Sequence, residues 1–167
     1  TLSNTNGYFG NTFVGQGTLA LVGAGVISNS PSLVVSNGAT FDVSGVSGTT
    51  LLMDLNITTA AITVGPTNQL IPIRVNSFEA DGIVAKSNIL NVLALPPVAS
   101  YPSTLTLIKS ANPITLTGGN FNFALGLLPI GFSGGIALSA DGPELRLVLT
   151  SGPVGVGHSV IWAGYNF

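Results

Sequence analysis

Apolar and polar residues alternate with a period of two along most of this chain. Clear examples are Thr40-Phe41-Asp42-Val43 and Glu144-Leu145-Arg146-Leu147-Val148-Leu149. This alternation, rich in β-branched residues, is typical of half-buried β-strands. It predicts strands at 18–21, 32–35, 40–43, 54–58, 62–64, 71–75, 89–92, 104–107, 114–117, 121–123 and 144–149.

Turn-forming residues separate these runs. Asn37-Gly38, Asp81-Gly82 and Asp141-Gly142-Pro143 are examples, and they predict tight connections between short strands. Apolar residues at helical spacing after a capping residue are missing from the sequence, so we expect no long helix. Gly82 indicates that Glu79 and Asp81 flank a turn.

An all-β chain of many short strands fits a sandwich, a barrel or a β-solenoid. Few strong hairpin turns are present, and Thr, Ser and Asn recur beside Val, Leu and Ile, which suits stacked ladders of like residues. The segments GTLALVGAG, SLVVSNGAT and ATFDVSGVSG are loosely similar and indicate rungs of roughly twenty residues. We therefore predict a parallel β-helix, or β-solenoid, with a β-sandwich as the alternative.

We interpret residues 1–167 as a single β-rich module. Rungs are expected over 1–100, continuing β structure over 101–153, and a junction to a next unit over 154–167.

Several of these segments resemble a known family. VGQGTLAL at 14–21 and GATFDVSG at 38–45 resemble the autotransporter-associated β-strand repeat of large secreted bacterial surface proteins. LTLIKS, FALGLLP, LRLVLTS and the final VIWAG are similar to the module that follows such repeats. The resemblance is best over 14–55 and 104–164. It implies a right-handed parallel β-helix at the bacterial cell surface, one unit of a tandem array, without catalytic residues. The outer-membrane barrel of a full autotransporter is not in this sequence, so the anchor stays open.

The charge content is very low. Six acidic and four basic residues make up 6% of the chain, against roughly 25% in ordinary domains. Because the basic residues are scattered, neither nucleic-acid binding nor a polybasic membrane patch is expected. Like charges stacked at the ~4.8 Å strand spacing would repel, so a stacking protein favours Thr, Ser, Asn and Gly outside. Low charge also favours an extracellular or cell-surface, secreted location.

Groups for catalysis are few. The chain has no Cys and one His, His158, so the usual zinc ligand sets and a Ser-His-acid triad lack support. A polysaccharide lyase on a β-helix would need a basic residue beside carboxylates, and Arg74 with Glu79 and Asp81 is the only candidate set. We interpret both acids as solvated turn residues. We therefore assign no catalytic, cofactor or metal residue and predict that the chain is not an enzyme.

The apolar stretch 123–138 contains Pro129 and is too short for a membrane-spanning helix.

Aromatic residues gather near both ends of the sequence. They are Tyr8, Phe9 and Phe13, and Trp162, Tyr165 and Phe167. We interpret them as packing faces between units, since the open ends of stacked strands must be covered. The expected function is a structural subunit of an extracellular fibre or stalk that stacks head to tail with itself. The alternative is an adhesin or carbohydrate-binding module that contacts surface glycans through a loop such as 96–103.

Overall fold

The computed structural model describes residues 1–66, 68, 70–82 and 87–155. This part of the chain has thirteen strands and no helix, which confirms the all-β prediction. The strands are β1 (Thr12–Val14), β2 (Thr18–Gly23), β3 (Ser32–Ser36), β4 (Thr40–Val46), β5 (Thr50–Thr58), β6 (Ala61–Val64), β7 (Ile73–Asp81), β8 (Asn88–Val92), β9 (Ser103–Ser110), β10 (Thr115–Leu116), β11 (Phe123–Leu125), β12 (Ser133–Leu138) and β13 (Glu144–Ser151).

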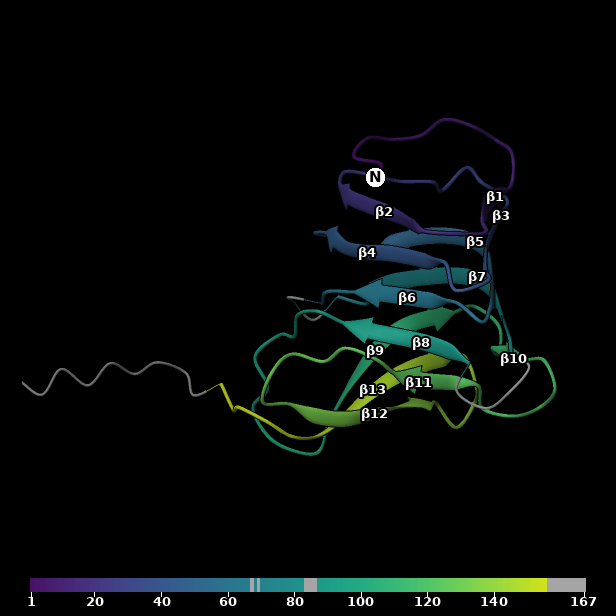
Figure 1. Ribbon diagram of the computed structural model, residues 1–167. Coiled ribbons are helices and arrows are strands. Elements are labelled where there is room, and N and C mark those ends of the chain that lie inside the picture. Colours follow the sequence, from purple (N-terminus) through teal and green to yellow (C-terminus); the bar gives the residue numbers. More distant parts are fainter. Residues whose placement is uncertain (67, 69, 83–86, 156–167) are drawn as a thin grey trace, which may run out of the picture.

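From β1 to β9 the chain alternates between two sheets. One has eight strands in the order β1-β3-β5-β7-β9-β13-β12, with β10 also beside β7, and the other has the order β11-β8-β6-β4-β2. From β1 to β7, each strand pairs in parallel with the strand two positions further along the chain, and β8 pairs in parallel with β11. Figure 1 shows β2, β4, β6, β8 and β11 lying one above another. Parallel sheets are therefore confirmed.

The spacing of paired residues matches the expected repeat at the start of the stack. Leu33 pairs with Leu55, 22 residues further on, and Thr18 pairs with Thr40 at the same spacing. Later turns are longer, since Ile73 pairs with Ile108. Most of the extra residues between Ile73 and Ile108 lie in the connection 93–102, outside the paired strands.

The core lies between the two sheets. Inward side chains form apolar ladders, with Leu33, Leu55 and Phe78 on one sheet and Phe41, Ile62 and Leu90 on the other, all buried. Phe78 of β7 contacts Phe123 of β11 edge to face, with ring centroids 5.9 Å apart. This contact joins the two sheets through the core.

The last two strands reverse the strand direction. After β9, the β12–β13 hairpin adds to the eight-stranded sheet in antiparallel orientation, with β13 against β9 and β12 outermost. Leu145, Leu147 and Leu149 of β13 are fully buried. The hairpin thus extends the sheet and covers the core at this end.

The strand predictions need three corrections. β1 and β12 lack the clear alternation that marks the other strands and were not predicted. β7 extends to Asp81, because residues 77–81 pair with 54–58 of β5. Glu79 therefore lies within a strand rather than beside a turn, and Asp81 is the last residue of that strand. Pairing with a neighbouring strand outweighs the local turn signal of Gly82.

Candidate functional site

The first end of the stack has an unpaired edge. β1 pairs only with β3, so its other edge has no partner strand among the described residues. Phe13 points outward from β1 and is 73% exposed, and Phe9 just before the strand is 79% exposed. An edge strand without a partner offers backbone N–H and C=O groups to another chain.

Hydrogen bonds hold the aromatic segment against β1. The Tyr8 hydroxyl lies 2.7 Å from Thr12 Oγ1, which in turn lies 2.8 Å from Ser30 Oγ. Ser30 also donates to the carbonyl oxygen of Gly10. Tyr8, Phe9 and Phe13 thus lie at the same end of the stack. Trp162, Tyr165 and Phe167 lie outside the described residues, as does His158.

The neighbouring edge of the five-stranded sheet is covered. The N-terminal segment runs beside β2, with isolated bridges Leu2–Leu21 and Thr5–Val26. The Leu2 amide donates to Ala20 O at 2.8 Å, and the Val22 amide donates to Leu2 O at 3.0 Å. At this end, therefore, the β1 edge is the open one.

The second end of the stack has a hollow between two edge strands. β11 pairs only with β8, and β12 pairs only with β13, within the described part of the chain. The hollow has a volume of about 450 Å³ and is lined by Phe121, Phe123, Ala124, Leu125, Gly134, Gly135 and Ile136. Sequence reasoning missed it. The available signal was the apolar spacing at 121, 123 and 125 together with the Gly134-Gly135 pair.

A cluster of charged side chains lies on the outer face of the eight-stranded sheet. Glu144 lies 2.8 Å from Lys109 Nζ and also accepts hydrogen bonds from Arg146 and Thr106. The Lys109 ammonium, followed by the Arg146 guanidinium, lowers the pKa of Glu144 from 4.5 to about 2, although partial burial opposes this shift. The Glu144-x-Arg146 spacing places two of these groups on one face, whereas Lys109 arrives through strand pairing.

Arg74, Glu79 and Asp81 do not form a catalytic pocket. All three lie on the outer face of β7, and Arg74 lies five residues before Glu79. The hollow beside Arg74 is lined by Leu51, Leu52, Val75, Asn76, Lys109, Ser110 and Ala111, and neither acid contributes to it. The arrangement therefore gives no support to the lyase hypothesis.

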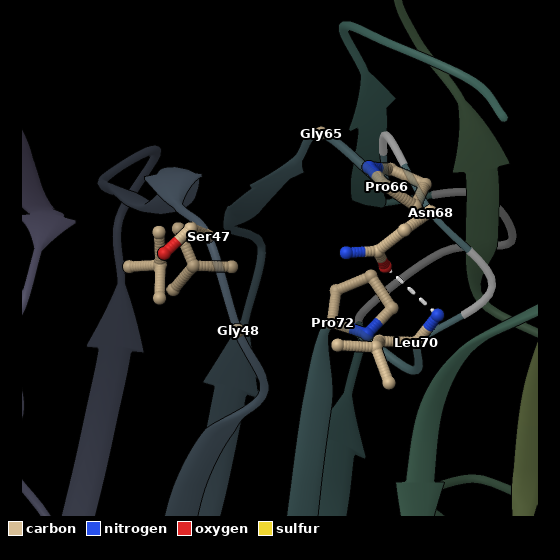
Figure 2. A pocket seen from close by; sticks show the side chains of 9 residues that line it. Ser47, Gly48, Gly65, Pro66, Asn68, Leu70 and Pro72 are labelled. Carbon is tan, nitrogen blue, oxygen red and sulfur yellow. Dashed lines mark hydrogen bonds between the residues drawn. The ribbon is translucent and has the colours of Figure 1, made fainter.

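The other hollows offer little chemistry. Figure 2 shows one of about 10 Å³, between the turn after β4 and the connection 65–72, where the Leu70 amide donates to Asn68 Oδ1. None of its lining residues is ionisable. Within the described ranges, no three His, Cys, Asp or Glu side chains come together as metal ligands would. In the same residues, no helix has the length and hydrophobicity needed to cross a membrane.

The loop 96–103 is fixed to its surroundings. Val98 is buried, and its carbonyl oxygen accepts a hydrogen bond from the Gly155 amide at 2.8 Å. The Tyr101 hydroxyl donates to Pro153 O at 2.9 Å. These contacts tie the loop to the segment after β13, so its aromatic side chain already has a partner within the chain.

Comparisons with protein-family models, curated proteins and solved structures gave no significant match.

Proposed function

We propose that this chain is a β-solenoid module that stacks end to end with like units in an extracellular bacterial fibre or stalk. The observation that carries the proposal is the pair of open ends: the β1 edge with its exposed aromatic rings, and the β11–β12 hollow with its apolar lining. The alternation of β1 to β9 between two sheets, with parallel pairing throughout, supports the solenoid interpretation.

The chemistry of the two ends suits mutual contact. Edge strands pair through backbone hydrogen bonds, which need no charged side chain, and buried aromatic rings dominate the energy of many interfaces. Phe9 and Phe13 provide exposed rings at one end, and Phe121, Leu125 and Ile136 line a hollow at the other. A contact between unlike ends that does not close on itself produces a filament.

The resemblance to autotransporter-associated repeats supports the same proposal. In such an array, neighbouring units are joined covalently, and the open ends meet within one polypeptide. The cell-surface location and the bacterial source are part of this proposal.

Sedimentation velocity and negative-stain microscopy test the stacking. The chain is expected to form unbranched filaments or a concentration-dependent series of oligomers. Phe13→Ser and Ile136→Lys are each expected to weaken association about tenfold or more, because each removes an apolar contact at one end. Leu93→Ser, at an exposed position outside both ends, is the matched control.

A single monomeric species at high concentration would overturn the stacking proposal. If the exposed ring of Phe9 binds carbohydrate instead, the protein gives a signal on a glycan array. Phe9→Ser then abolishes this signal and leaves the oligomeric state unchanged.

A further inference from the structure

Most of the chain's few charges lie on one surface. Seven of the ten charged residues project from the outer face of the eight-stranded sheet: Asp54, Arg74, Glu79, Asp81, Lys109, Glu144 and Arg146. Of the others, Asp42 is on the five-stranded sheet, Asp141 is in the hairpin turn and Lys86 is outside the described residues. The charges are therefore concentrated on one face.

The two signs are separated on this face. Arg74 and Lys109 are paired in register on β7 and β9, and Arg146 lies on β13 beyond them; we call these three residues the basic side. Asp54, Glu79 and Asp81 form the acidic side. With Glu144 among the three cations, the basic side has a net charge of +2 and the acidic side −3.

The two sides do not neutralise each other within one molecule. Arg74 and Glu79 are five residues apart on the same strand, about 17 Å at the usual rise. This exceeds the Debye length of ~8 Å at physiological salt. Among the described residues, no acid of the acidic side lies within 4.0 Å of a cationic nitrogen. The Arg74–Lys109 pairing also puts like charges on adjacent strands, which is unfavourable without a further anion.

We propose that this face pairs with the same face of a second copy of the chain, about a two-fold axis near Asn76 and Ser77. Such an axis places Arg74 opposite the partner's Glu79 and, by symmetry, Glu79 opposite the partner's Arg74. A two-fold contact of this kind uses one self-complementary patch on both molecules. Glu79 of each copy thereby supplies an anion to the basic side of the other.

The surface has the shape and composition that the contact requires. A hollow of about 320 Å³ lies between Arg74 and Lys109, where a carboxylate can enter. Leu51 and Met53 on β5 are 57% and 45% exposed beside it, and burial of such apolar area favours association. The five strands β3, β5, β7, β9 and β13 span about 24 Å by about 30 Å, or about 700 Å². A standard interface buries about 800 Å² on each partner.

Charge exchange between two positions tests the proposal. The background is Ile136→Lys, which blocks stacking at the β11–β12 hollow and leaves the outer face of the eight-stranded sheet unchanged, so that only side-by-side pairing is measured. In sedimentation equilibrium at about 0.01 M salt, this protein is expected to dimerise, and at about 1 M salt it is expected to be monomeric. Arg74→Glu and Glu79→Arg are each expected to weaken dimerisation about tenfold or more, because each places like charges opposite one another.

The combined Arg74→Glu/Glu79→Arg variant is the decisive measurement. A two-fold contact predicts that it restores the dimer to within about threefold of the background, because both facing pairs are again of opposite sign. Asp42→Lys changes the charge on the other sheet and is expected to leave dimerisation unchanged. A monomer at low salt, or a double variant as weak as the single ones, overturns the proposal. End-to-end filaments in the parent chain would survive that outcome, so the two proposals fail separately.

Discussion

At the scale of single residues, the charged side chains of β9 and β13 form ion pairs because strand pairing brings them together. Glu144 is largely covered and accepts hydrogen bonds from Lys109, Arg146 and Thr106. A carboxylate shared between two cations is held in its ionised form. The ionised Glu144 carboxylate therefore stabilises the pairing of the β12–β13 hairpin with β9.

The Glu144 ion pairs make stability depend on pH in the acid range. Because the pKa of Glu144 is lowered from 4.5 to about 2 on folding, its stabilisation is complete above pH 4.5 and is lost as pH falls toward 2. Glu144→Gln is expected to lower the free energy of unfolding by about 1 kcal/mol at neutral pH. The difference from the wild type is expected to shrink as the pH approaches 2.

Urea unfolding at a series of pH values measures this effect. Asp141→Asn removes a carboxylate from the same hairpin without breaking an ion pair, so its effect gives the contribution of net charge alone. A Glu144→Gln deficit that stays constant down to pH 2 would contradict the assigned role.

At the scale of elements, the covered edge of β2 depends on a glycine. A Cβ built on Gly25 would lie 2.2 Å from the carbonyl oxygen of Leu2, and this atom belongs to the backbone and cannot rotate away. Gly25→Ala is expected to displace the N-terminal segment from β2. Hydrogen exchange of the Leu2 and Val22 amides is then expected to be about tenfold faster, or about 1.4 kcal/mol in local opening energy.

Gly7→Ala is the matched control for this displacement, because a Cβ on Gly7 meets nothing within 4 Å. Equal exchange rates in wild type and Gly25→Ala would show that the segment tolerates the shift.

Elements with regular alternation were predictable from the sequence, and those specified by pairing were not. Runs such as 40–43 and 144–149 became β4 and β13. β1 has three residues and β12 contains Gly134 and Gly135, so neither has enough alternating side chains to mark a strand. The aromatic end at Tyr8, Phe9 and Phe13 was visible as composition. The β11–β12 hollow was not, because these two consecutive strands lie at the edges of different sheets, and the local sequence pattern does not show which strands end a sheet.

The separation of charge on the outer sheet face was also hidden from the sequence. The four basic residues look scattered along the chain, and strand pairing brings Arg74 and Lys109 into register. Two like charges therefore meet on adjacent strands at this position, although stacked like charges repel. The register depends on which strands pair with each other. Because the connections 65–72 and 93–102 vary in length, the local sequence pattern does not predict that pairing.

At the scale of the whole molecule, one contact spans the core between the sheets. Phe78 is buried and packs edge to face on Phe123 of the opposite sheet. Phe78→Ala is expected to lower the free energy of unfolding by about 3–5 kcal/mol, since it leaves a cavity between both sheets. Guanidinium unfolding followed by circular dichroism measures the change.

Leu93→Ala is the control for this substitution, because Leu93 is an exposed apolar residue, and its effect is expected to stay within about 0.5 kcal/mol. A Phe78→Ala loss as small as that of Leu93→Ala would show that the two sheets are stabilised independently.

The β12–β13 hairpin makes the two ends of the molecule chemically different: one ends in a parallel edge strand with aromatic rings, the other in an antiparallel hairpin. A row of copies joined end to end is therefore polar, like an arrow, and its two tips are never equivalent. In the proposed surface fibre, an anchor at the hairpin tip would turn every ring-bearing tip away from the cell. Such a fibre grows by one kind of binding event and can be stopped by one kind of cap.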